Sequence, residues 1–159
     1  MCLVIDACCL AKVFDGNNHE HSDFVPVLNW ITIGKGRMIY GGTKYKTELA
    51  QASRFLRMVV NLERAGKTIR VPDDAVDEIA SALKAKVTDP EFDDEHLVAL
   101  VIVSRCLVVC TIDHIAMRYL KRKDMYSGYS VKKPRIYSSQ RNANLCCEKH
   151  LIKSPLHQN

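Results

Sequence analysis

Short runs of apolar residues alternate along the chain with longer segments whose apolar residues recur at helical spacing. The first run, residues 2–5, is wholly apolar and rich in β-branched residues, which predicts a strand buried on both faces. Further strands are predicted at 38–40, 67–71, 107–111 and, as an edge strand, 135–138. Helices are predicted between them at 7–14, 23–33, 43–65, 73–86, 94–105, 114–123 and 142–151.

This alternation predicts the fold class. Strands that alternate with helices form a mostly parallel sheet with helices on both faces, so we expect a three-layer α/β/α architecture. Ser22 is expected to cap the second helix and Thr43 the long third helix, which should run unbroken to about Ala65. The stretch Leu97–Val103 is apolar at every position, which predicts a helix buried nearly all round.

Length and composition point to one globular domain over residues 1–150, with 151–159 as a frayed tail. No apolar run is long enough to cross a bilayer, and the first ten residues lack the charged start and cleavage site of a signal peptide. The seven cysteines include two adjacent pairs and no CxxC-type spacing. We therefore expect a cytoplasmic protein with free thiols, neither membrane-bound nor built around a thiolate metal site.

The net charge of +5 is unevenly distributed. Residues 118–159 hold ten Lys and Arg against two acids, so that segment carries +8 and residues 1–117 carry −3. An acidic body beside a basic segment suits a protein that holds cations at one place and a polyanion beside it. A solvated basic surface with no partner is the alternative.

Two acids stand directly after predicted strands. Asp6 follows the first strand and Asp113 follows the strand at 107–111. In an open α/β sheet, ligands bind in the crevice beyond the carboxyl ends of the strands, so both side chains are expected there. Asp93 and Asp94 begin the buried helix, where Asp93 is expected to cap it and Asp94 is then free to join the other two acids.

Carboxylates that gather in one place need a cation to neutralise them. Their hard oxygen ligands suit Mg²⁺ or Mn²⁺, which keep several waters and also bind phosphate oxygens. Such an ion activates water for attack on a phosphodiester and stabilises the leaving oxygen. Glu48, early in the third helix, is a further acid near this edge, although an acid there also complements the helix dipole.

The order of these acids resembles that of the PIN-domain ribonucleases. The resemblance runs from about Leu3 to Leu145, and it rests on four stretches. These are Val4-Ile-Asp6, Tyr45-Lys-Thr-Glu48-Leu, Asp93-Asp94-Glu-His-Leu-Val-Ala-Leu and Cys110-Thr-Ile-Asp113. Carried over by position, the resemblance implies that Asp6, Glu48, Asp94 and Asp113 are the catalytic, metal-binding acids, with Thr111 and Asp93 as supporting neighbours.

The resemblance also implies an activity and partners. It implies a Mg²⁺- or Mn²⁺-dependent endoribonuclease that cleaves RNA, frequently as a homodimer. Many single-domain members are toxins of toxin–antitoxin or defence systems, which implies an antitoxin or other regulatory protein as a partner. His96 has two interpretations. It either contacts a metal-binding acid or the substrate phosphate or, more simply, is a packing residue of its helix.

A phosphodiester substrate needs cations outside the metal site. Lys44 and Lys46 open the helix that carries Glu48, where the helix N-terminus itself favours phosphate. Arg118 begins a second basic group that continues with Lys121, Arg122 and Lys123, followed by Tyr126 and Tyr129 for base stacking. Lys44, Lys46 and Arg118 are the expected substrate-binding residues.

Two other functions remain open. A catalytically inactive PIN-like module would bind RNA or protein without cleavage, although all four acidic positions are filled here. A phosphate-signalling receiver domain would need paired acids after the first strand, where Asp6 stands alone.

Overall fold

The sheet has five parallel strands in the order β3-β2-β1-β4-β5, with the first strand at its centre. The structure is a computed structural model that describes residues 2–147. The strands are β1 (Cys2–Ile5), β2 (Arg37–Tyr40), β3 (Thr68–Arg70), β4 (Val108–Cys110) and β5 (Arg135–Tyr137). The expected parallel sheet is thus confirmed, and β5 is an edge strand as expected.

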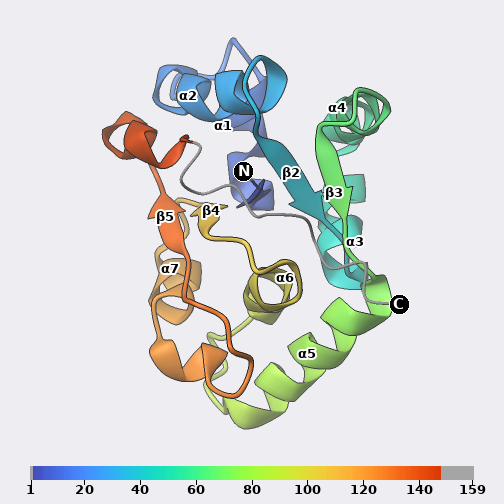
Figure 1. Cartoon of the computed structure of the whole chain (residues 1–159), viewed down its shortest axis with the longest axis vertical. Coiled ribbons are helices and arrows are strands. Elements are labelled where there is room, and N and C mark those ends of the chain that lie inside the picture. The colour runs from blue at the N-terminus through green and yellow to red at the C-terminus, as the bar shows by residue number, and fades with distance from the viewer. Residues whose placement is uncertain (1, 148–159) are drawn as a thin grey trace.

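Helices cover both faces of this sheet. The α-helices are α1 (Leu10–Phe14), α2 (His21–Thr32), α3 (Thr43–Gln51), α4 (Ser53–Arg64), α5 (Asp73–Lys86), α6 (Glu95–Ser104) and α7 (His114–Leu120). Short 3-10 helices are η1 (Ala7–Cys9), η2 (Lys123–Tyr126) and η3 (Gln140–Leu145). In Figure 1, α1, α2 and α4 lie on one side of the sheet and α5, α6 and α7 on the other, which gives the expected three layers.

The core lies where the sheet meets α6. Every residue of β1 is buried, and α6 is buried from Leu97 to Ile102, as its continuous apolar run predicts. The helix ends at Arg105, which adopts the left-handed conformation (φ 55°). This packing holds the central strand and the start of α6 in fixed positions.

The long third helix of the prediction is wrong. The chain leaves helical geometry at Ala52 (φ −88°, ψ 55°) and forms two helices, α3 and α4. The two pack on different partners, α3 on α5 and α6, and α4 on α1 and β3. Thr43 is the first residue of α3 and not its cap, because Gly42 occupies the cap position.

Other predicted ends also shift. Helix α2 begins one residue before Ser22, which therefore lies inside the helix and does not cap it. The last predicted helix is the 3-10 helix η3, and the predicted tail at 151–159 lies outside the described residues.

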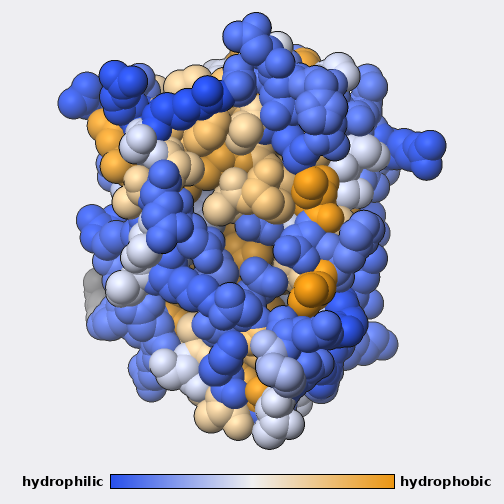
Figure 2. All heavy atoms as spheres, turned by 180° about the vertical axis from the view of Figure 1, so that it is seen from behind, coloured by the Kyte–Doolittle hydropathy of each residue, from blue (hydrophilic) through white to orange (hydrophobic). Residues whose placement is uncertain are grey.

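The described surface is mostly hydrophilic. From behind, apolar side chains gather in the upper and middle part of one face within a frame of hydrophilic ones (Figure 2). Among residues 2–147, no helix has the length and apolar character needed to cross a membrane.

Candidate metal centre

The strand order makes a crevice between β1 and β4. From β1 the chain moves to β2 on one side, and after β3 it crosses back to β4 on the other side. Such a switch point is where open α/β sheets bind ligands, beyond the carboxyl ends of the strands. Asp6 directly follows β1 there, and only 6% of this residue is exposed.

One hydroxyl links the two acids that follow these strands. The Thr111 side chain donates from Oγ1 to Oδ2 of Asp6 at 2.6 Å, and its oxygen accepts the backbone N–H of Asp113 at 3.0 Å. Thr111 is fully buried, so this hydroxyl has one fixed environment. Asp113 also caps α7, because its Oδ1 accepts the N–H groups of Ile115 (2.7 Å) and Ala116 (3.1 Å).

Asp94 lies close enough to both acids to respond to their charge. Its pKa is raised to about 6, first because burial disfavours the carboxylate and then because of the negative charges of Asp6 and Asp113. His96 and Lys44 oppose this increase without cancelling it. Asp6, Asp94 and Asp113 therefore share one region, as the sequence predicted.

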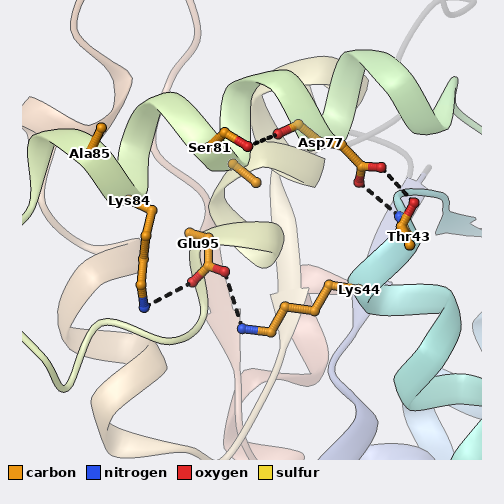
Figure 3. A pocket seen from close by; sticks show the side chains of 8 residues that line it. Thr43, Lys44, Asp77, Ser81, Lys84, Ala85 and Glu95 are labelled. Atoms are coloured by element: carbon orange, nitrogen blue, oxygen red, sulfur yellow. Dashed lines mark hydrogen bonds and ion pairs between the residues drawn. The ribbon is translucent and has the colours of Figure 1, made fainter.

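The carboxylate of Asp93 lies in a different environment from that of Asp94. Its carboxylate lies 2.9 Å from Nζ of Lys44 and 3.7 Å from Nζ of Lys84, and 80% of its side chain is exposed. Both lysines also pair with Glu95 across an open groove between α5 and the starts of α3 and α6 (Figure 3). The expected capping of α6 by Asp93 is wrong, because these lysines hold the carboxylate, and α6 begins without a side-chain cap.

Glu48 reaches the same region from α3. Its Oε2 lies 3.1 Å from Nε2 of His96, which is 2% exposed. The other ring nitrogen of His96, Nδ1, is buried and has no hydrogen-bond partner among the described residues. Tyr45, one turn before Glu48, is fully buried and donates to the carbonyl oxygen of Ile5 at 2.5 Å.

Tyr45 shows that Glu48 and Asp6 lie on the same side of the molecule. Burial raises the pKa of its phenol well above the usual value, and the negative charges of Asp6 and Glu48 raise it further. The four predicted acids thus converge on the crevice. We call Asp6, Glu48, Asp94 and Asp113 the acidic cluster.

The donor set fits a hard divalent cation in its chemistry. It consists of carboxylates, and the pKa of Asp94 is raised by burial and then by repulsion from Asp6 and Asp113, which a cation would relieve. Within residues 2–147, however, no three His, Cys, Asp or Glu side chains stand close enough to coordinate one ion together. Mg²⁺ is commonly held by one or two carboxylates and retains several waters, so the remaining acids would act through water.

The three cations expected to bind substrate all pair with carboxylates of this chain. Lys44 pairs with Asp93 and Glu95, and Nζ of Lys46 lies 2.6 Å from Asp73. Arg118 pairs with Glu91 (2.8 Å) and Asp89 (3.3 Å). A phosphate would have to displace a carboxylate at each of them.

The N-terminus of α3 is also filled. The N–H of Gly42 donates to Asp73 at 2.9 Å, and the N–H of Thr43 donates to Asp77 at 2.8 Å. These two acids of α5 therefore occupy the position at α3 where phosphate binding was expected.

Sequence reasoning missed two neighbours of the acidic cluster, Tyr45 and Cys8. Tyr45 supports the strand before Asp6, and the only sequence signal for it is its position one turn before Glu48. The exposed Cys8 has its Sγ 3.8 Å from Oγ1 of Thr111. Tyr126, expected to stack on bases, is buried and donates to the carbonyl oxygen of Leu120.

Comparisons with known proteins identify no relative. No protein-family model matches the chain, and no curated protein and no solved structure is significantly similar to it.

Proposed function

We propose that this protein is a metal-dependent endoribonuclease of PIN-like design. The proposal starts from the resemblance of its acidic positions to those of PIN-domain ribonucleases. The observation that carries it is electrostatic: the charges of Asp6 and Asp113 help to raise the pKa of Asp94 to about 6, at the switch point of the sheet. Glu48 completes the acidic cluster from α3.

The roles of the residues follow from their contacts. Asp6, Glu48, Asp94 and Asp113 would hold Mg²⁺ or Mn²⁺, which supplies an activated water and stabilisation of the leaving oxygen. Thr111 orients the Asp6 carboxylate, and His96 orients that of Glu48. With a pKa raised to about 6, Asp94 would be protonated in part of the molecules near that pH, and a bound cation would favour its carboxylate form.

The biological setting belongs to the same proposal. We propose that the enzyme is the toxin of a toxin–antitoxin or defence system, acts in the cytoplasm and forms a homodimer. The support for a reducing compartment is that Cys2, Cys9, Cys106 and Cys110 are buried free thiols. An antitoxin or another regulatory protein is then the expected partner.

A non-catalytic RNA- or protein-binding module is the alternative function. It is favoured by the absence, among the described residues, of three side chains placed to coordinate one ion directly. Binding of Mn²⁺ by the purified protein separates the two functions, because the module has no need of the metal.

Cleavage of RNA with Mn²⁺ or Mg²⁺ tests the proposal. Asp6→Asn and Asp94→Asn are each expected to lower the cleavage rate at least about 100-fold, because each removes a negative ligand charge. Asp93→Asn is the matched variant one position away, and it should keep the rate within about threefold because its carboxylate pairs with Lys44. A chelator should stop cleavage by the wild type.

Two results would reject the proposal. One is wild-type cleavage that survives the chelator, and the other is undiminished cleavage by both Asp6→Asn and Asp94→Asn. Circular dichroism of each variant checks that the fold is kept.

A further inference from the structure

Five cations with no carboxylate partner among residues 2–147 lie between α7 and the start of β5. They are Lys121, Lys123, Lys132, Lys133 and Arg135, all exposed, and we call them the basic strip. No ion pair joins any of them to an acid in the described part of the chain. Asp124 is the one acid in this segment, and it pairs with Arg122 at 2.7 Å.

The two ends of the basic strip lie close together. Nζ of Lys133 lies 3.5 Å from the carbonyl oxygen of Lys121, so the two ends of the segment meet. Lys133 and Arg135 flank the buried Pro134 as the chain enters β5. Lys123 and Lys132 are close neighbours of these residues in sequence.

The cations near the acidic cluster differ from those of the basic strip because they have carboxylate partners. Lys44, Lys46, Lys84 and Arg118 all pair with carboxylates of the chain itself. Unpaired cations held side by side repel one another, and a polyanion relieves that repulsion. Of these cationic groups, the basic strip is therefore the one best suited to bind an external polyanion.

The basic strip and the acidic cluster are separate surfaces. Arg135 begins β5, whereas the acidic cluster lies beyond the ends of β1 and β4 in a parallel sheet. The seven residues of α7 lie between Asp113 and Lys121, a helix length of about 10 Å. A polyanion that reaches both surfaces at once has to span at least this length.

The chemistry of the strip selects the kind of polyanion. Tyr126 is buried and Tyr129 is half-buried, so the segment offers no exposed ring on which an unpaired base would stack. The exposed large apolar side chains (Ile33, Leu56, Met58, Val60 and Ile115) lie elsewhere, so the strip has nothing to insert into a membrane. What remains is a row of point charges suited to phosphates, without base recognition.

We propose that the basic strip binds the phosphate backbone of double-stranded RNA, and so holds a folded RNA beside the acidic cluster. The choice of RNA rests on the proposed function. The binding itself does not require cleavage, because no residue of the strip belongs to the acidic cluster.

Binding of a short RNA duplex in chelator tests this inference. Fluorescence anisotropy over a range of salt concentrations compares the wild type with Lys132→Ala/Lys133→Ala. The double variant should bind at least about 10-fold more weakly. Its slope of log Kd against log salt should also fall by about 2, since each lost phosphate contact contributes about 0.9.

The matched control is Arg57→Ala/Arg64→Ala on α4. Both arginines are exposed, and replacing them removes the same charge as the lysine double variant does. They lie on α4, which packs on β3 at the sheet edge opposite β5. Their loss should leave duplex binding within about twofold. Equal losses in the two double variants would overturn the inference, because net charge alone would then explain binding.

Two further comparisons decide the partner. Unchanged duplex binding by Lys132→Ala/Lys133→Ala overturns the inference, as does tighter strip-dependent binding to phosphatidylserine vesicles or single-stranded RNA. The chelator separates this test from the proposed function. Strip-dependent duplex binding without any Mn²⁺-dependent cleavage supports the strip and rejects the nuclease, whereas the reverse outcome rejects only the strip.

Discussion

Two adjacent aspartates before α6 have opposite environments. Asp93 is exposed and pairs with Lys44 and Lys84, whereas Asp94 is partly buried near Asp6 and Asp113. Both residues are suitable helix caps by residue type, and Asp93 was the predicted cap of α6. What separates them is two lysines from α3 and α5, which no local pattern around Asp93 contains.

The raised pKa of Asp94 predicts a pH-dependent stability. The ordinary value is 3.8 and the folded value is about 6, so folding favours the protonated form and stability falls as pH rises between these values. Asp94→Asn mimics the protonated form. In chelator it should raise the free energy of unfolding by about 1 kcal/mol at pH 7.5, after allowance for the partial exposure of Asp94, and by nothing at pH values below about 4.

Urea unfolding of both proteins at the two pH values measures this difference. A variant less stable than the wild type at pH 7.5 would contradict the repulsion among Asp6, Asp94 and Asp113.

His96 should control the affinity for Mn²⁺ through Glu48. Its Nε2 contacts the Glu48 carboxylate at 3.1 Å, and the His96 side chain is only 3% exposed, whereas that of Glu48 is 28% exposed. His96→Phe fills the space without a hydrogen bond and should weaken Mn²⁺ binding about 10-fold, whereas His96→Gln keeps a donor and should bind nearly as well as the wild type. Isothermal titration calorimetry measures both, and equal affinities for the two variants would reduce His96 to a packing residue.

At the scale of elements, α3 and the start of α6 are joined by two polar links on one face of α3. Lys44 contacts Asp93 and Glu95, and Glu48, one turn later, contacts His96. Lys44 also donates to the backbone carbonyl oxygen of Asp93. The segment that carries Asp94 is thereby held to the helix that carries Glu48.

Lys44→Met should loosen that segment. The apolar stem is kept while the three hydrogen bonds to Asp93 and Glu95 are lost, so we expect about 1 kcal/mol lower stability. Amide hydrogen exchange at residues 93–96 should become faster. Lys46→Met, which breaks the pair with Asp73 on the other side of α3, should leave exchange at 93–96 unchanged.

The sequence predicted the elements better than their interruptions. The buried α6 was predicted because its apolar run is continuous, and β1 because it is short and β-branched. The break at Ala52 carries no Gly or Pro, and the helical spacing of apolar residues continues through it. The break follows from packing of α3 and α4 on different partners, which local patterns do not contain.

For the whole molecule, the strand order explains why distant acids converge. Asp6 and Asp113 were predicted from their places after strands, since parallel strands end at a common edge. The ion pairs of Lys44, Lys46 and Arg118 were not predicted, because each depends on acids from a separate segment. The positions of acids at the sheet edge could thus be predicted from sequence, whereas the ion-pair partners of long charged side chains could not.

Binding of Mn²⁺ at the acidic cluster should stabilise the whole fold. At a metal concentration about 100 times the Kd the gain is about 2.7 kcal/mol, which raises Tm by roughly 5–10 °C for a chain of this size. Asp6→Asn/Asp94→Asn should abolish this increase, and Asp93→Asn should keep it. Differential scanning calorimetry with and without Mn²⁺ measures the effect, and an equal rise in the double variant would mean that the metal binds elsewhere.

The pairing of β1 with β4 has a consequence for biosynthesis. The central strand β1 is synthesised before the other four strands, yet its neighbour β4 is synthesised only after β2, β3 and α6. Contacts so distant along the chain form slowly compared with those of local helical hairpins. A nascent chain therefore lacks the complete set of four carboxylates until Asp113 has emerged, and the proposed nuclease would stay inactive until then.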